Sequence, residues 1–204
     1  NNFKTDEFPK KDIATIMGIE QYCLFRIGDA GFPLQQLQFS SPGENKFPNA
    51  DTGKLLQPSE WYHVAVVYDT EKKTAVIYVD GREQSRIEDY GNGEPVNLGK
   101  QTRGSDFMFK IGHSYGEPDY MERQLDGEIC EVRVWNVARS QQEIFDNMYN
   151  IEDPANTPGL QAYWKFNEGE GDIAKDYTRH GNDAKSYAKA TWPTGIEVTQ
   201  KNKE

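Results

Sequence analysis

Short runs in which hydrophobic and polar residues alternate cover most of the chain, and this period of two is typical of strands with one buried face. The clearest runs are residues 61–69 and 74–79, which are separated by a four-residue polar loop. In the first run, Val64 and Val66 share one face. Two alternating runs joined so closely predict an antiparallel hairpin.

The same pattern predicts further strands, and in one of them Cys23, Phe25 and Ile27 share a face. Residues 82–103, in contrast, are predicted to be mostly polar loop. The further strands are expected at 13–19, 22–27, 37–39, 107–111, 125–135 and 160–166, with a closing strand around 184–188.

One short helix is expected after the strand at 125–135. Ser140 and Glu143 have the spacing of a capping box, in which each residue binds the backbone N–H of the other. Ile144, Phe145 and Met148 then form an apolar stripe. Many short strands and one helix predict an all-β sandwich or barrel.

Length and charge narrow the range of functions. The 204 residues fit one domain. A formal net charge of -10 repels phosphate groups, so nucleic acids and anionic membranes are poor partners. No apolar run approaches the roughly 18 residues of a membrane-spanning helix, so no membrane span is expected. An acidic surface suits neutral glycans, cations or basic proteins equally well.

The two cysteines, Cys23 and Cys130, fall in predicted strands. No Cys-x-x-Cys motif is present, which excludes the usual zinc and redox motifs. Two unbridged thiols are favoured over a disulfide, although spacing in the sequence does not decide between them.

Several motifs that cover most of the chain after residue 60 resemble the laminin-G-like branch of the concanavalin A-like lectin/glucanase superfamily. This resemblance implies a two-sheet antiparallel jelly-roll sandwich with one short helix. Cys130 is a departure, because many members have an acidic residue there that can face a cation. The motifs are WYHVAVVYD at 61–69, IYVDG at 77–81, FKIG at 109–112, LDGEICEVRVWN at 125–136, GLQAYWKF at 159–166 and DYTRHGN at 176–182.

The segment 17–31 resembles a narrower group, the gut-bacterial cell-surface lipoproteins that carry this module at their C-terminal end. The resemblance implies an outward-facing protein, anchored as a lipoprotein, with a preceding domain in the same polypeptide. We expect residues 1–197 to form the sandwich, without its first strand, and residues 198–204 to form a tail.

A calcium site is the first candidate for chemistry, because hard cations bind carboxylate and carbonyl oxygens at loop edges. The turn after residue 175 offers Asp176, Thr178 and Asn182, and Glu131 would complete the shell if its strand runs beside this turn. The alternative is an Asx turn, in which the aspartate binds only its own backbone.

Glycan binding is the second candidate. Sugars are held by aromatic rings that stack on their C–H faces and by planar polar side chains. Tyr90, Tyr115 and Tyr120 lie in predicted loops and are candidate platforms, with Asn92 as a polar partner. The alternative is that these tyrosines fold down onto strand ends.

Catalysis is not expected. Glycosidases of this fold need two carboxylates at a defined separation across the sugar bond. Asp126 and Glu128 alternate, as do Glu168, Glu170 and Asp172, but glycines interrupt both sets. Neither set is the E-x-D-x-x-E pattern of the β-glucanases.

The sequence therefore predicts a non-catalytic binding module of a secreted or surface-anchored protein, with a glycan as its ligand. A structural or protein-interaction sandwich is the main alternative, and a glycoside hydrolase is the third.

Overall fold

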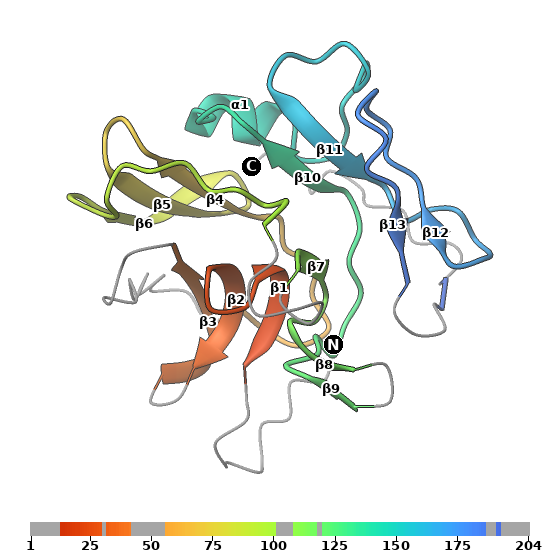
Figure 1. Cartoon of the computed structure of the whole chain (residues 1–204). Coiled ribbons are helices and arrows are strands. Elements are labelled where there is room, and N and C mark those ends of the chain that lie inside the picture. Colours follow the sequence, from red (N-terminus) through yellow and green to blue (C-terminus); the bar gives the residue numbers. More distant parts are fainter. Residues whose placement is uncertain are drawn as a thin grey trace. The chain divides into compact units, whose positions relative to one another are not determined.

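The computed structural model describes residues 13–29, 32–41, 56–100, 108–117, 120–186 and 191–192, and the strands and helix below belong to these residues. The chain divides into two compact units, residues 1–128 and 129–204. Almost all regular structure is strand in antiparallel pairs, with one short helix (Figure 1). The prediction of an all-β protein is confirmed. No helix in the described part of the chain is long and apolar enough to cross a membrane.

The first sheet of the first unit has four strands in the order β3-β2-β1-β7. They are β1 (Ala14–Ile19), β2 (Cys23–Asp29), β3 (Phe32–Ser40) and β7 (Lys110–Ile111). β1 and β2 fall where alternation predicts them. β3 begins earlier than residue 37, because Phe32 already pairs with Asp29 of β2, beyond an irregularity in the register.

The second sheet contains β4 (Val64–Asp69), β5 (Thr74–Val79) and β6 (Arg82–Ile87). The predicted hairpin is confirmed, since β4 and β5 pair in register from Val64 opposite Val79 to Asp69 opposite Thr74. The prediction that residues 82–103 are mostly loop is wrong at its beginning, where β6 pairs with β5. β6 lies at the sheet edge, where backbone pairing needs no apolar side chains.

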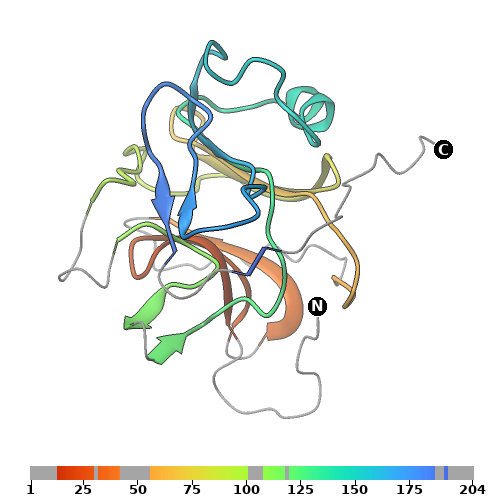
Figure 2. The same cartoon turned by 90° about the vertical axis from the view of Figure 1, so that its right-hand side faces the viewer.

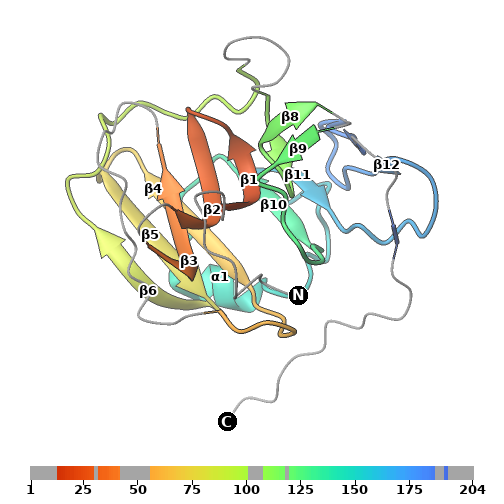
Figure 3. The ribbon, with the colours of Figure 1, turned by 90° about the horizontal axis from the view of Figure 1, so that it is seen from below.

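The two sheets of the first unit face each other across one hydrophobic core (Figures 1 and 3). Full burial of a valine, leucine, isoleucine or phenylalanine side chain contributes roughly 1.5–3 kcal/mol to stability. The predicted face of β2 and the alternate residues of β5 supply most of this core. Its buried members are Cys23, Phe25, Ile27, Leu37, Phe39, Leu56, Ala75, Ile77, Val79 and Tyr90.

The second unit contains β10 (Val132–Trp135) and β11 (Leu160–Trp164), which pair with each other, and β12 (Ile173–Ala174) and β13 (Ala184–Lys185), which form a second pair (Figure 2). The strand predicted at 125–135 begins only at residue 132. The reason is Glu131, whose backbone is left-handed, with a φ of 57°.

The helix α1 (Gln141–Asp146) begins where the capping box predicts it. The Ser140 hydroxyl accepts a hydrogen bond from the backbone N–H of Glu143, and the Glu143 carboxylate accepts one from the N–H of Ser140. Ile144 and Met148 are buried, as their stripe predicts.

The proposed division into a sandwich and a tail remains a prediction, and residues 198–204 lie outside the described part of the chain. Both cysteines are unbridged thiols, and burial raises the pKa of Cys23 to about 12.

Candidate ligand-binding site

Tyr90 is a core residue, and its prediction as a sugar platform is corrected. Its ring is 1% exposed and contacts the rings of Phe39 and Tyr68. Its hydroxyl oxygen accepts a hydrogen bond from the N–H of Ser41 at 3.0 Å. A buried ring cannot stack on a ligand. The polar sequence around Tyr90 hides this burial, because the contacts come from residues distant in the sequence.

Asn92 and the other two predicted tyrosines belong to different local structures. Asn92 is exposed, and its Oδ1 accepts the N–H of Glu94 at 3.0 Å, as in an Asx turn. Tyr115 and Tyr120 lie in the paired strands β8 (Tyr115–Glu117) and β9 (Tyr120–Glu122), not in loops as predicted. Their side chains lie outside the described structure, so their role in binding remains a prediction.

The turn after β12 is organised by the carboxylate of Asp176. Oδ1 accepts hydrogen bonds from the N–H groups of Thr178 at 2.9 Å and Tyr163 at 3.1 Å. Oδ2 accepts one from the N–H of Asn182 at 2.9 Å, and the Thr178 hydroxyl lies 2.8 Å from both oxygens. The carboxylate thus ties the turn to β11.

These hydrogen bonds set the charge of Asp176. Partial burial by itself raises the pKa of the carboxyl group, but the N–H donors of Thr178, Asn182 and Tyr163 outweigh it. The pKa of Asp176 therefore lies below its ordinary value of 3.8, and the group is ionised at neutral pH.

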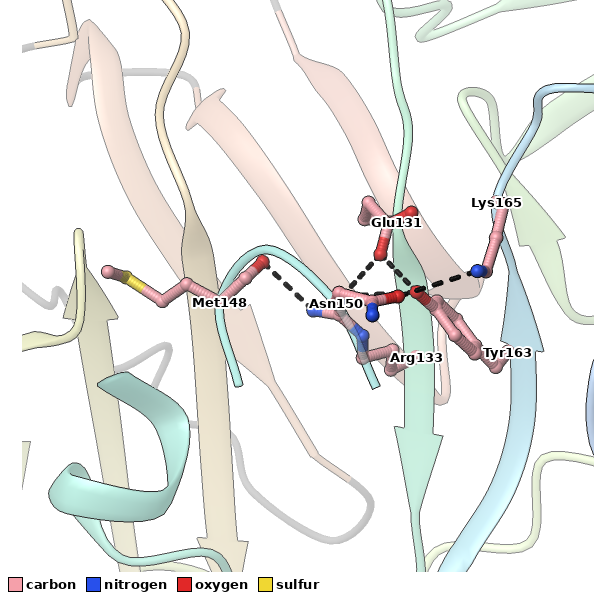
Figure 4. A network of polar contacts seen from close by, with 6 residues as sticks. All are labelled: Glu131, Arg133, Met148, Asn150, Tyr163 and Lys165. Atoms are coloured by element: carbon pink, nitrogen blue, oxygen red, sulfur yellow. Dashed lines mark hydrogen bonds and ion pairs between the residues drawn. The ribbon is translucent and has the colours of Figure 1, made fainter. Parts of the chain in front are cut away.

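Glu131 takes part in a separate network beside β11 (Figure 4). Its carboxylate accepts hydrogen bonds from the guanidinium of Arg133 and from the hydroxyl of Tyr163. Arg133 also donates to the carbonyl oxygen of Met148 at 3.1 Å. Burial, followed by the hydrogen bond to Glu131, raises the pKa of Tyr163 to about 12, so the tyrosine keeps its proton.

The four residues predicted to bind calcium do not fit a cation in this arrangement. The Asp176 oxygens accept N–H and O–H groups, and the Asn182 carbonyl accepts the indole N–H of Trp164 at 2.7 Å. Tyr163 binds Asp176 through its backbone but Glu131 through its hydroxyl, so the two carboxylates meet opposite ends of one residue. Calcium binding remains a prediction, and it requires these donors to turn away.

An exposed aromatic residue in the same turn was missed by the sequence analysis. Tyr177 is 37% exposed, although its backbone and hydroxyl are both held. Its N–H donates to the carbonyl oxygen of Tyr163 at 2.9 Å, and its hydroxyl donates to Oδ1 of Asn167 at 3.1 Å. Its ring lies 6.0 Å from that of Tyr163.

A lysine accompanies this ring. The ammonium nitrogen of Lys165 lies 5.0 Å from the ring centre of Tyr177 and 5.5 Å from that of Tyr163, which is cation–π distance. It also donates to Oδ1 of Asn150 at 3.4 Å (Figure 4). We call Tyr177, Lys165 and Asn167 the Tyr177 platform.

The Tyr177 platform brings together groups of the kinds that hold sugars in other proteins. It combines a fixed, partly exposed ring with a cation and a planar amide. In the sequence, Tyr177 lies within the motif DYTRHGN, whose oxygen-bearing residues were predicted to bind a cation. That prediction gave the tyrosine itself no role. Sequence pattern alone does not distinguish an exposed tyrosine from a buried one.

The acidic residues considered for catalysis are at the surface or bind the backbone. Asp126 and Glu128 are exposed, and so are Glu170 and Asp172. Glu168 accepts the N–H of Lys175 at 2.8 Å through Oε1 and thereby supports the loop.

The chain matches one family model over residues 3–145, and that family is described as the concanavalin A-like lectin/glucanases superfamily. This chain belongs to that superfamily. The match confirms the resemblance inferred from the motifs. It also identifies the fold as the concanavalin A-like β-sandwich with one short helix. Among curated proteins, none gives a significant match.

Two solved structures are similar to this superfamily member. One is a presumed carbohydrate-binding protein from Bacteroides ovatus ATCC 8483, with 36% identity, a TM-score of 0.66 and coverage of 84% of this chain. This chain spans only 46% of that protein. The other is an S-layer domain-containing protein (residues 221–444) from Clostridium thermocellum ATCC 27405, with 18% identity, a TM-score of 0.29 and coverage of 72% of this chain and 69% of the other.

Proposed function

We propose that this superfamily member is a non-catalytic carbohydrate-binding module. The observation that carries the proposal is the 36% identity, over 84% of this chain, to the Bacteroides ovatus protein, which is itself presumed to bind carbohydrate. A fold of the lectin/glucanase type is consistent with a binding module. Fold alone does not determine function, so the residues of the site must also support the proposed function.

The Tyr177 platform supports this proposal. An exposed ring normally keeps conformational freedom, but the hydrogen bonds of Tyr177 to Tyr163 and Asn167 fix its position. A ring that is fixed before the ligand arrives loses little entropy on binding. This property suits stacking on the C–H face of a sugar.

A binding role, and not hydrolysis, agrees with the placement of the acidic residues. A glycosidase holds an acid and a second carboxylate about 5–10 Å apart across the sugar bond. Near the Tyr177 platform, Asp176 binds backbone N–H groups and Glu131 is paired with Arg133. These carboxylates are engaged in holding the structure.

We further propose that the module works outside a bacterial cell, as part of a longer, lipoprotein-anchored polypeptide with a preceding domain. The length of the Bacteroides ovatus protein, of which this chain spans 46%, supports a multidomain context. Labelling of intact cells with an antibody against this chain, before and after surface proteolysis, tests the location.

A glycan array probed with the purified chain, with calcium and with a chelator, tests the function. We expect binding to a restricted set of glycans, and loss of all signal on chelation would support the predicted calcium site. Replacing Tyr177 with alanine should lower affinity about tenfold or more, which corresponds to about 1.4 kcal/mol.

Trp61→Ala is the matched control, because Trp61 is an equally exposed aromatic residue, at 38%, in the first unit. Its affinity should match that of the wild type. A folded chain that binds no glycan under either condition would overturn the proposal and would favour a structural or protein-interaction role.

A further inference from the structure

The positively charged ammonium group of Lys165 lies beside two tyrosine rings. Its ammonium group lies within cation–π distance of both Tyr163 and Tyr177, and its hydrogen bond to Asn150 is long at 3.4 Å. An ammonium group has three N–H donors. The group therefore lies beside the two rings and retains N–H donors for another acceptor.

Three acidic residues of the second unit bind groups other than the Lys165 ammonium. Glu131 is paired with Arg133, and Asp183 is paired with Lys175 at 2.7 Å. The Asp176 carboxylate accepts N–H groups from its own turn and from β11. Among the described residues, Lys165 forms no ion pair with any carboxylate.

The absence of an ion pair for Lys165 among these residues is notable in an acidic protein. The chain has 33 acidic residues against 23 lysines and arginines, so a lysine packed beside two rings would be expected to find a carboxylate. Arg179, two residues after Tyr177, is also exposed and without an ion pair among the described residues. Within the described part of the chain, Lys165 beside the Tyr177 ring and Arg179 in the same turn thus have no carboxylate partner.

We propose that the Tyr177 platform binds an acidic sugar, a hexuronic acid residue, with its ring on Tyr177 and its carboxylate on Lys165. This inference rests on the proposed carbohydrate-binding function. A carboxylate accepts strong, charge-assisted hydrogen bonds from an ammonium group. The ring of the same sugar offers the C–H face that stacks on tyrosine.

The chemistry of the ligand separates this proposal from general sugar binding. A neutral sugar would use Tyr177 and Asn167 but would leave the charge of Lys165 without a counter-ion. Because the interaction with Lys165 is ionic, it should weaken as salt concentration rises. Neutral stacking should depend little on salt.

The test compares oligomers of galacturonic, glucuronic and mannuronic acid with the same oligomers after reduction of their carboxyl groups to alcohols. Binding of both forms is measured by calorimetry at low and high salt. We expect at least one acidic oligomer to bind at least tenfold more tightly than its reduced form. High salt should reduce this difference.

Two variants assign the preference to Lys165. Lys165→Met keeps a long apolar side chain but removes the charge, and it should abolish the preference for the acidic form. Lys165→Arg keeps the charge and should retain most of the preference. Circular dichroism spectra identical to the wild type would show that both variants fold.

The outcomes separate the two proposals. Equal binding of acidic and reduced oligomers, or an unchanged preference in Lys165→Met, would overturn the acidic-sugar inference and leave the carbohydrate-binding function intact. Absence of binding to these oligomers and to every glycan of the array would overturn both.

Discussion

Gly18 in β1 has no room for a side chain. Its φ is 139°, and an added Cβ would lie 2.2 Å from the carbonyl oxygen of Cys23 in the neighbouring strand. Gly18→Ala should therefore destabilise the first unit by about 2–4 kcal/mol, through backbone strain and steric overlap. Urea denaturation measures this loss.

Gly93→Ala is the matched control for Gly18 in the same unit. Gly93 also has a positive φ, 81°, but the nearest atom to its added Cβ is 3.3 Å away. This variant should lose only about 1–2 kcal/mol. Equal losses in the two variants would show that the close approach of β2 is not what requires glycine at position 18.

Asp176 should make stability depend on pH. Because its folded-state pKa lies below the ordinary 3.8, its ionised form stabilises the fold above about pH 4, and this contribution is lost as pH falls through the folded pKa. Asp176→Asn should cost about 1–3 kcal/mol at pH 7. Thermal unfolding from pH 7 to pH 2 should show the two proteins converging at low pH.

Asp172→Asn serves as the comparison for Asp176, because Asp172 is exposed and lies 3.9 Å from Lys185, its ion-pair partner. It should change stability little at any pH. A constant difference between Asp176→Asn and the wild type down to pH 2 would contradict the role given to the ionised carboxylate.

Individual tyrosines show where sequence reasoning stops at the residue scale. Tyr90 and Tyr177 both lie in polar, glycine-containing segments, but the first is 1% exposed and the second 37%. The difference comes from Phe39 and Tyr68, which are remote from Tyr90 in the sequence and enclose it in the core. Local pattern contains no information about such contacts.

Among the elements, α1 depends most clearly on one side chain. The Ser140 hydroxyl accepts the N–H of Glu143, and the helix has only six residues. Ser140→Ala should cost about 1 kcal/mol, whereas Ser140→Asp should retain the cap and most of the stability. Chemical denaturation of the two variants measures this difference, and equal losses would rule out capping as the cause.

Elements were predictable where their pattern is local. The β4–β5 hairpin and the capping box follow from neighbouring residues. In contrast, β6 has the polar sequence REQSRI and is a strand because it pairs with β5. The start of β10 depends on the left-handed backbone of Glu131, which a glutamate does not normally adopt.

At the scale of the whole molecule, charge dominates behaviour in solution. The chain carries a net charge of -10 at pH 7 and has an isoelectric point near 4.9. Self-repulsion should keep it soluble at neutral pH, and solubility should be lowest near pH 4.9. Light scattering across pH 4–8 checks this, and a minimum above pH 6 would contradict it.

In the candidate site too, contacts between residues close in the sequence were predictable, and contacts between distant residues were not. Asp176, Thr178 and Asn182 were grouped correctly as one turn, because their contacts lie within seven residues. The pairing of Glu131 with Arg133 and Tyr163 was not predicted, because Tyr163 is remote from Glu131 in the sequence, and the role of Glu131 as a metal ligand remains a prediction.

The turn after β12 separates the residues that shape it from those that face outward. Asp176 and Thr178 supply its side-chain hydrogen bonds, whereas the Tyr177 ring and the Arg179 side chain are exposed between and beyond them. Substitutions at positions 177 and 179 could therefore change what the turn recognises without unfolding it. A library randomised at these two positions would be a direct source of new specificities.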